Sequence, residues 1–218
     1  MSKIRRSSPL VSENLVLCED FRSLVMQEEY LSFLLVKDQD LSRIDLSVCF
    51  LEDVMFQDCV LSETNFQQTG LDRVYFIDCD LTNSSFSDCR LNDCRFMQVK
   101  ALGSEFSSAV LDRVAFTACN LRYANFTSAS LKQCSLHETD CTEAFFPECK
   151  FAELALNQSI FTKTDFSRTP LSGVDFSSSE LESIHLSEGA PELKGARVNA
   201  MQASSLALLM GLVITDWA

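Results

Sequence analysis

From Leu41 to Leu186, an apolar residue occurs at every fifth position in one uninterrupted register, and polar residues fill most of the positions between. Of the 30 positions in this series, 28 are Leu or Phe, and the exceptions are Ala101 and Cys141. An α-helix gives an apolar stripe with a period of 3.6 and a half-buried strand gives a period of two, so neither explains a strict period of five. The pattern therefore predicts a repeat architecture.

The repeat unit consists of a small residue, a polar residue, a central Leu or Phe and two further polar residues. Residues 64–68 (TNFQQ) and 124–128 (ANFTS) are examples. This unit resembles that of the pentapeptide-repeat family, whose motif is commonly written A(D/N)LXX, over about two thirds of the chain. The resemblance implies an all-β fold, a right-handed quadrilateral parallel β-helix in which four repeats form the four faces of each coil.

Columns of residues 20 positions apart support this geometry. If one coil contains 20 residues, the central residues of successive coils stack, and two such columns are rich in Phe while the intervening columns are rich in Leu. The Phe columns are Phe66, Phe86, Phe106, Phe126, Phe146 and Phe166, and Phe56, Phe76, Phe96 and Phe116. A period of ten gives the same alternation, so the pattern indicates an even number of faces. We expect Phe on two opposite faces and a thin spot in the core at Ala101.

Nine of the ten cysteines fall within the repeats, and Cys18 precedes them. Eight of the cysteines stand two positions before a central residue, a slot that otherwise holds mainly Ala, Ser, Thr and Val, so we interpret them as small buried apolar side chains. No CxxC pair occurs, which disfavours a zinc or redox site. Cys59 and Cys79 are expected to stack in adjacent coils, near enough for a disulfide in principle. Structural cysteines of this kind favour a reducing, cytoplasmic location.

The charge of the chain is acidic and lies in outward positions. The formal net charge is −13, and residues 41–188 contain 22 acidic and 11 basic residues. Stacked neighbours such as Asp53, Arg73 and Asp93 alternate in sign and predict an exposed ladder of ion pairs, whereas Arg90, Arg95 and Lys100 predict a local basic patch. The candidate partner-binding acidic residues are Asp53, Asp58, Glu63, Asp78, Asp80, Asp88, Asp93, Glu138, Glu143, Glu148 and Glu153.

The chain divides into three parts. Residues 1–20 are expected to be an N-terminal tail, residues 21–188 the β-helix, with residues 21–40 as its N-terminal cap, and residues 189–218 a C-terminal cap. Residues 193–198 fit one last strand, and residues 200–210 have helix-forming composition with Gly211 as a C-terminal stop. Apolar residues at helical spacing predict that this short helix is amphipathic.

The C-terminal segment also suggests a function. Gln202, Ala203 and Ser204, followed by Leu206 and Gly211, resemble the tail of the topoisomerase-protecting branch of the family, which includes the Qnr and MfpA proteins. That resemblance implies a homodimer and an acidic rod that mimics DNA and binds DNA gyrase or topoisomerase IV. The expected dimer interface consists of Leu206, Leu209, Met210, Leu212 and Val213.

The charge density of the rod and the unbroken repeat both limit this hypothesis. The rod is expected to be about 40 Å long, and duplex DNA of that length carries about 24 charges, more than twice the net charge of −11 of residues 41–188. The mimicry is therefore partial. The five-residue phase never slips, so the chain resembles the loop-free MfpA type more than the Qnr proteins, whose loops contribute to protection. Protection against a quinolone and protection against a peptide poison stay open.

A second hypothesis is a structural or scaffolding module that binds another protein through Met55, Tyr75 and Phe145. An enzyme is disfavoured, because the two histidines, His137 and His185, fall in outward slots on different faces and no glycine-rich phosphate loop occurs. We expect no catalytic residue, cofactor or metal site. Direct nucleic-acid binding is disfavoured by the negative charge, and no apolar run is long enough to span a membrane.

Overall fold

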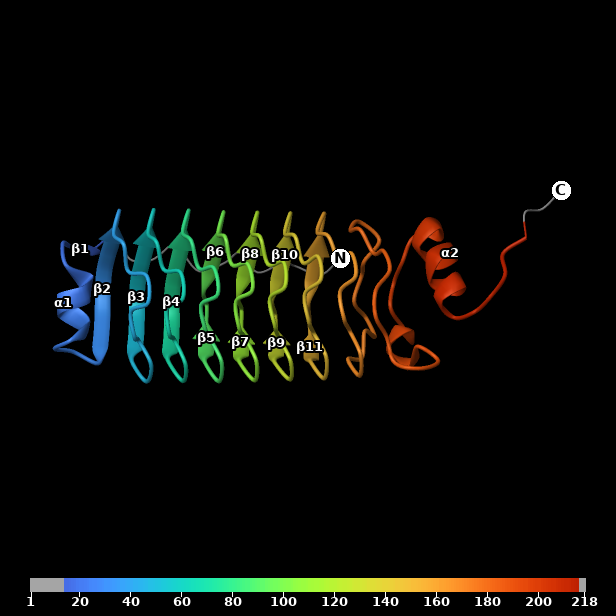
Figure 1. Ribbon diagram of the computed structural model, residues 1–218, viewed down its shortest axis with the longest axis horizontal. Coiled ribbons are helices and arrows are strands. Elements are labelled where there is room, and N and C mark those ends of the chain that lie inside the picture. Colours follow the sequence, from blue (N-terminus) through green and yellow to red (C-terminus); the bar gives the residue numbers. More distant parts are fainter. Residues whose placement is uncertain (1–13, 216–218) are drawn as a thin grey trace.

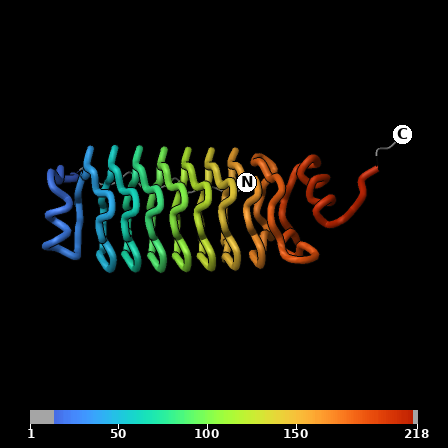
Figure 2. Tube along the Cα trace, in the orientation of Figure 1, coloured from blue at the N-terminus to red at the C-terminus, as the bar shows by residue number. Residues whose placement is uncertain are grey.

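The computed structural model describes residues 14–215 as a rod of stacked coils closed at each end by a short helical segment (Figure 1). From residue 30 to residue 157, residues paired across the parallel sheet are 20 positions apart, as Leu51 with Leu71 and Leu111 with Leu131. Four five-residue repeats therefore make one coil, and the predicted quadrilateral β-helix is confirmed. Figure 2 shows the coils following one another at an even spacing along most of the rod.

The strands all belong to one parallel sheet, which runs along two adjacent faces of the rod. The elements are β1 (Val16–Cys18), α1 (Phe21–Val25), β2 (Tyr30–Lys37), β3 (Phe50–Gln57), β4 (Gly70–Ile77), β5 (Arg90–Asn92), β6 (Arg95–Met97), β7 (Val110–Asp112), β8 (Ala115–Thr117), β9 (Ser130–Lys132), β10 (Ser135–His137), β11 (Lys150–Ala152), β12 (Ala155–Asn157), a 3₁₀ turn (Pro191–Leu193) and α2 (Ala200–Leu209).

We name the four faces I to IV after the central residues Leu41, Leu46, Leu51 and Phe56 and the positions that follow each at intervals of 20. Faces III and IV carry the strands, and β3 and β4 each cross both faces, whereas later coils have a separate strand on each. Faces I and II are held by isolated bridges one coil apart. Two neighbouring faces meet at a corner, which is formed by the last residue of each repeat.

Central Phe rings fill the core from opposite sides. On face II, the rings of Phe86 and Phe106 are parallel, with centroids 4.8 Å apart, and on face IV the centroids of Phe76 and Phe96 are 4.9 Å apart. Across the core, Phe86 and Phe96 meet edge to face at 6.0 Å. The predicted pair of opposing Phe columns is confirmed, and both ring geometries are favourable for aromatic pairs.

The slot that precedes a central residue by two positions is buried at nearly every repeat, and its polar side chains donate hydrogen bonds to backbone carbonyls of the preceding coil. The Cys89 thiol donates to the Phe66 carbonyl at 2.6 Å, and the Ser104 hydroxyl donates to the Leu81 carbonyl at 2.7 Å. All ten cysteines lie within residues 14–215 and none is in a disulfide. The Cys79 thiol lies beside Cys59, and this contact together with burial raises its pKa. Nine of the cysteines are therefore buried core residues, as expected for those in the repeats, and Cys18 packs partly buried against the core.

Nearly every corner residue adopts the left-handed conformation. The φ angle is 52° at Asp53, 54° at Asp58 and 57° at Glu63, and in residues 41–188 only Gly103 and Gly173 supply a glycine at such a position. A left-handed conformation costs a non-glycine residue roughly 1–2 kcal/mol. Ladder hydrogen bonds hold the corners in place, as where the Asp58 amide donates to the Ile77 carbonyl at 3.0 Å. The five-residue pattern does not reveal this strain.

A corner glycine is expected to stabilise the rod. Ala118 is exposed and has φ of 53°. Ala118→Gly should raise the free energy of unfolding by up to about 1 kcal/mol, because relief of the steric cost exceeds the added entropy of the unfolded chain. The control Ala152→Gly, at an exposed strand position in β11, should lower it by about 0.5–1 kcal/mol. Urea unfolding measures both, and a loss of stability in Ala118→Gly contradicts the prediction.

The N-terminal end is closed by α1. Phe21 is fully buried and meets Phe56 edge to face at 5.2 Å, so its ring covers the open end of the core. The Gln39 side chain accepts from the Phe21 amide at 3.1 Å and donates to the Cys18 carbonyl at 2.6 Å. β1 pairs with β2, so Val16–Cys18 belong to the cap rather than to a tail that extends to residue 20. The rest of the expected tail, residues 1–13, lies outside the described residues.

The C-terminal helix forms where the sequence predicts it. Asn199 and Gln202 form a reciprocal capping box at the start of α2. The Gln202 amide also donates to the carbonyls of Phe176 and Ser179 at 2.9 and 2.6 Å, so it completes the hydrogen bonding of the last coil. The expected strand at residues 193–198 does not form within the described residues. Pro191–Leu193 make a 3₁₀ turn, and a single bridge joins Arg197 to Asp175.

The Glu192 side chain accepts hydrogen bonds that the backbone of a following coil would otherwise accept. Glu192 is 4% exposed, and its Oε1 accepts from the backbone amides of Arg168 and Ser187 at 2.7 and 3.2 Å. In earlier coils the equivalent corner amide donates to a backbone carbonyl, as from Glu148 to Ser167. Burial alone raises the pKa of Glu192, but hydrogen bonds from Ser187 and the Arg168 amide outweigh it, and the pKa is held below its ordinary value.

Glu192→Gln should therefore make stability less dependent on pH. Because the folded-state pKa is lowered, the carboxylate's contribution is complete above the unfolded value of about 4.3 and is lost as the pH falls through the folded value. At pH 7 we expect the variant to lose about 1–2 kcal/mol, and this difference should shrink towards pH 3. Urea unfolding between pH 3 and 7 measures it, with exposed Glu188→Gln as the control. A difference independent of pH contradicts the assignment.

Candidate partner-binding surface

The structure distributes the predicted acidic residues around the whole rod. Asp80 lies on face I, and the other ten lie at corners, where the repeat positions them with positive φ. The corner between faces III and IV carries Asp53, Asp93 and Glu153; that between IV and I carries Asp58, Asp78 and Glu138; that between I and II carries Glu63 and Glu143; and that between II and III carries Asp88 and Glu148. The eleven carboxylates therefore do not form one surface.

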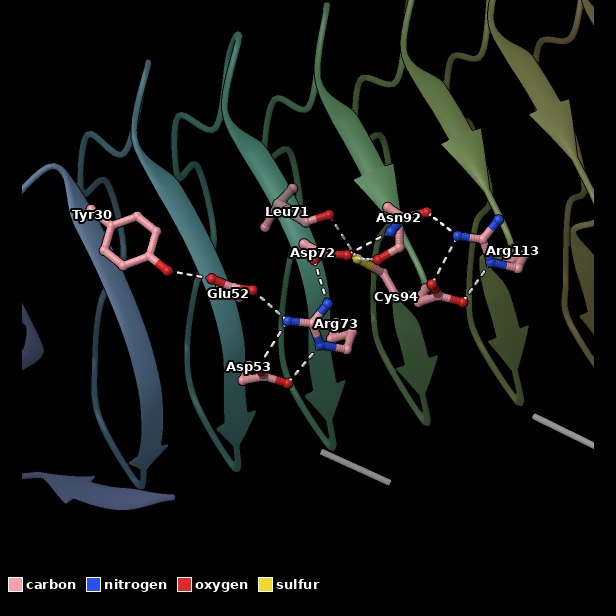
Figure 3. Close-up of polar contacts among 10 residues, drawn as sticks. Tyr30, Glu52, Asp53, Leu71, Asp72, Arg73, Asn92, Cys94 and Arg113 are labelled. Carbon is pink, nitrogen blue, oxygen red and sulfur yellow. Dashed lines mark hydrogen bonds and ion pairs between the residues drawn. The ribbon is translucent and has the colours of Figure 1, made fainter. Parts of the chain in front are cut away.

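At the corner between faces III and IV, arginine side chains neutralise Asp53 and Asp93 (Figure 3). Arg73 binds the Asp53 carboxylate through Nε at 2.8 Å and Nη2 at 2.9 Å, and it also pairs with Glu52 and Asp72. Two coils further on, Arg113 binds Asp93 with the same bidentate geometry. The predicted ladder of alternating charges is confirmed. The pKa of Arg73 is raised, and its hydrogen bond to Asp53 is the largest cause.

Further hydrogen bonds extend this network towards both ends. The Tyr30 hydroxyl donates to Glu52, and this bond, with the contribution of Arg73, lowers the pKa of Glu52. Asn92 donates to Asp72 at 2.5 Å and accepts from Arg113. Asp53, Asp93 and the carboxylates beside them thus share hydrogen-bonded partners and offer little unpaired negative charge. Glu153, at the same corner, is exposed and accepts from the Gln133 side chain at 3.1 Å.

Acidic residues at two other corners also have basic partners. Glu63 pairs with Arg43 at 2.9 Å and Glu148 with Arg168 at 3.0 Å, while Glu143 lies 3.7 Å from the Lys163 ammonium. Exposed pairs of this kind contribute little stability. Their effect on the surface is to reduce its local negative charge.

The corner between faces IV and I differs. Asp38, Asp58 and Asp78 follow one another in three successive coils, and all three are exposed. Within residues 14–215, no lysine or arginine forms an ion pair with any of them. Their amides donate to the carbonyls of Gln57, Ile77 and Met97 at 3.0–3.1 Å. We call Asp38, Asp58 and Asp78 the acidic corner. It presents carboxylates about 4.8 Å apart on a rigid backbone.

Two more carboxylates flank the acidic corner on face I. Asp40 and Asp80 each accept from a backbone amide two residues later at 3.0 Å, and the Ser42 hydroxyl and amide lower the pKa of Asp40. Sequence reasoning missed Asp38 and Asp40 because they fall in the atypical cap. The signal was present, since the apolar register continues back through Val36 and places Asp38 in the corner slot.

The other predicted surface features are dispersed. Arg90, Arg95 and Lys100 lie on faces III, IV and I of one coil, so they form a band around the rod rather than the expected patch. Among the residues of the scaffolding hypothesis, Tyr75 is only 5% exposed, Met55 is half-buried and Phe145 is 45% exposed. Met55 and Phe145 lie on opposite faces, and the three residues do not form one surface.

Within residues 14–215, no three acidic, histidine or cysteine residues are arranged to hold a metal ion, and no helix has the length and apolar character needed to cross a membrane. His137 lies on face IV beside Asn157, with its Nδ1 2.9 Å from the amide nitrogen, and His185 lies on face II. The histidines therefore occupy opposite faces, as expected.

The residues of the expected dimer interface separate into two groups. Leu206 is 6% exposed and packs on the core of its own chain, so it belongs to the cap. Leu209, Met210, Leu212 and Val213 are exposed, and Val213 is 86% exposed. The predicted amphipathic character of α2 is wrong, because of its residues only Gln202 and Leu206 are buried and its outer surface is also apolar.

Comparison with known proteins identifies the repeats. A family model described as a pentapeptide repeat region matches residues 69–146, and one described as pentapeptide repeats (8 copies) matches residues 139–177 and 149–187. No curated protein matches the chain. Two structures of QnrB1, a plasmid-mediated fluoroquinolone resistance protein, have a similar fold.

Both QnrB1 structures are of trypsin-treated single-substitution variants. The first aligns with a TM-score of 0.55 at 19% identity, over 86% of this chain and 99% of the QnrB1 chain. The second aligns with a TM-score of 0.53 at 22% identity, over 85% and 90%. At these identities the likeness concerns the fold. The family matches span residues 69–187, more than half of the chain, and the chain belongs to the pentapeptide-repeat proteins.

Proposed function

We propose that this protein binds a type II topoisomerase, DNA gyrase or topoisomerase IV, as a partial mimic of duplex DNA, and protects the enzyme from inhibitors such as quinolones or peptide poisons or modulates its response to them. The proposal draws on the resemblance of the C-terminal segment to the topoisomerase-protecting branch and on the fold shared with QnrB1, a fluoroquinolone resistance protein. On this proposal the protein acts in the cytoplasm and catalyses no reaction.

The observation that carries the proposal is the acidic corner. A protein groove that binds DNA offers arginine and lysine side chains to a row of phosphates. Asp38, Asp58 and Asp78 offer a comparable row of exposed anions without basic partners of their own among the described residues. Since the backbone ladder fixes their positions, little ordering entropy is lost when a basic groove closes on them. The neutralised corner at Arg73 is a poor candidate for the same role.

The uninterrupted rod supplies the shape. The described coils carry no inserted loop between Leu41 and Leu186, so contact with an enzyme must occur through faces, corners and ends. On this proposal two protomers join through their exposed C-terminal residues, Leu209, Met210, Leu212 and Val213, which lengthens the rod. The inhibitor that is countered depends on contacts beyond the acidic corner.

A competition experiment tests the proposal. Purified gyrase is bound to a fluorescent linear duplex, and the protein is titrated at 100 mM and 300 mM salt. We expect displacement of the duplex at micromolar protein and weaker displacement at the higher salt, because screening weakens contacts between exposed charges. Absence of displacement at both salt concentrations, for gyrase and for topoisomerase IV, contradicts the proposal.

A specific observation also favours a scaffolding role. The outward strand positions of face IV carry no acidic residue from Leu35 to Asn157, and they include Met55, Ile77 and Met97. Methionine and arginine are enriched where proteins bind proteins, and Arg95 lies on the same face. Capture of a partner other than a topoisomerase, lost in Met97→Glu but retained in the acidic-corner variant, favours this second function.

A further inference from the structure

The stacking of coils is interrupted at one place on faces III and IV. β11 and β12 stand at the two ends of the sheet order, and each pairs with a strand on one side only. The backbone of the next coil, residues 170–177, does not pair with β11 or β12 and instead pairs with residues that follow it in the chain. The Leu171 amide donates to the Glu192 carbonyl at 3.0 Å, and the Gly173 amide donates to the Gly195 carbonyl at 2.9 Å. A sheet edge is therefore left open in the side of the rod.

Pro170 accounts for the interruption. In the preceding coils the residue at this position donates its amide to the coil before it, from Lys150 to Ala129 and from Ser130 to Ala109, both at 2.9 Å. Proline has no amide hydrogen and cannot continue this ladder. At the following corner, the Gln133 amide donates to Ala152 at 2.7 Å, but the amide of Glu153 has no such partner within residues 14–215.

The core is exposed where the edge is open. Leu131, Cys134 and Leu136 are 1–2% exposed, whereas their counterparts one coil later, Phe151, Leu154 and Leu156, are only partly buried. These three side chains line a small apolar opening that also contacts Phe146, Phe161 and Phe166. Unpaired backbone and unburied apolar side chains thus coincide at what we call the β11–β12 edge.

The same chain carries a segment that complements this edge. Residues 212–215 follow the turn at Gly211, have no charge, and contain Leu212, Val213 and Ile214, which are 59%, 86% and 49% exposed. Branched apolar residues of this kind favour strands. Figure 1 shows the chain after α2 leading away from the rod. The segment therefore does not turn back to the edge of its own chain.

We propose that residues 212–215 of a second copy add as a strand to the β11–β12 edge and cover Leu154 and Leu156. Strand addition satisfies open backbone groups of the edge and removes apolar side chains of both copies from water. In a two-fold symmetric pair each copy gives one segment and receives one. This inference specifies the contact within the homodimer of the proposed function and rests on that part of it.

Complementation between two variants tests the exchange. Leu154→Glu blocks the edge and leaves the segment intact, whereas Val213→Asp disrupts the segment and leaves the edge intact. By sedimentation equilibrium, each variant alone should raise the dimer dissociation constant at least tenfold. An equimolar mixture should contain more dimer than either variant alone, because the heterodimer retains one complete junction. The control Val110→Glu, at an exposed residue of the paired strand β7, should dimerise as the unmodified chain does.

The outcomes separate this contact from the dimer itself. If Leu154→Glu dimerises normally while Val213→Asp does not, the segments contact one another and strand addition is overturned, although the homodimer stands. A monomeric unmodified chain overturns both, while the topoisomerase proposal is judged by its own competition assay.

Hydrogen exchange gives a second test that does not depend on whether Leu154→Glu folds correctly. In Val213→Asp, the amides of Phe151 and Leu156 should exchange at least tenfold faster than in the unmodified dimer, while that of Leu131 is unchanged. Equal exchange at Phe151 and Leu156 in the two proteins overturns the proposal.

Discussion

Phe96→Ala is expected to lower the free energy of unfolding by about 3–5 kcal/mol. Phe96 is fully buried between Phe76 and Phe116, with ring centroids 4.9 and 4.7 Å away, and it meets Phe106 edge to face at 6.2 Å. Because the backbone on both sides is fixed by ladder hydrogen bonds, neighbouring coils cannot close the cavity. The loss should therefore fall near the upper part of the range for Phe-to-Ala substitutions.

Urea unfolding of Phe96→Ala and Met97→Ala measures this effect. Met97 is the next residue, has its side chain on the outside of face IV and is 37% exposed, so its truncation should cost less than about 1 kcal/mol. The comparison holds strand, coil and position along the rod constant. Equal losses in the two variants are incompatible with a core built from continuous Phe columns.

The second large effect is expected at the acidic corner. The triple variant Asp38→Asn, Asp58→Asn, Asp78→Asn should weaken displacement of DNA from gyrase by about tenfold, because three exposed anions without basic partners are removed from one row. The backbone should be unaffected, since asparagine tolerates the left-handed conformation that all three positions adopt. Circular dichroism and thermal unfolding establish that the variant is folded.

A variant with the same change of charge elsewhere is the control. Glu63→Gln, Glu143→Gln, Glu148→Gln also removes three negative charges, but these carboxylates already face Arg43, Lys163 and Arg168. It should displace DNA nearly as well as the unmodified chain. If both triple variants lose activity equally, net charge alone governs binding, and the acidic corner has no special role.

The fold was predictable because one physical requirement recurs through the whole register from Leu41 to Leu186. A central Leu or Phe at every fifth position has to point inward in every repeat, so the pattern encodes the coil directly. The small buried slot that holds Cys89 and Ser104 follows from the same period. The positive φ of the corners leaves no such signal, because Asp, Glu, Arg and Ala all occupy corners and glycine is rare there.

The candidate site was less predictable, because ion pairing depends on the neighbour 20 residues away and on side-chain geometry. Asp53 and Asp58 look alike in the sequence, yet Asp53 is held by Arg73 and is 7% exposed, while Asp58 is exposed and unpaired with any basic residue described. Tyr75 was expected at the surface. In the sheet it stands between Met55 and Arg95 of adjacent strands and is buried.

The open sheet edge shows a second limit of the repeat pattern. Phe151, Leu154 and Leu156 keep the expected register. Phe151 stands in a column of Leu and Leu154 in a slot that is usually small, but neither departure marks a sheet edge. The cause lies one coil further on, where Pro170 falls in a slot that requires a backbone amide. Proline was visible in the sequence, but its effect becomes evident only once the ladder partners 21 residues apart are known.

The central claim is tested most directly by a gyrase supercoiling assay with the full chain, in the presence and absence of a quinolone or a peptide poison. At micromolar protein, we expect either restored supercoiling in the presence of an inhibitor or reduced supercoiling in its absence, and in both cases the acidic-corner variant should be at least tenfold less effective. Supercoiling unchanged by the protein, with and without each inhibitor and with both gyrase and, in the matching relaxation assay, topoisomerase IV, would contradict the account.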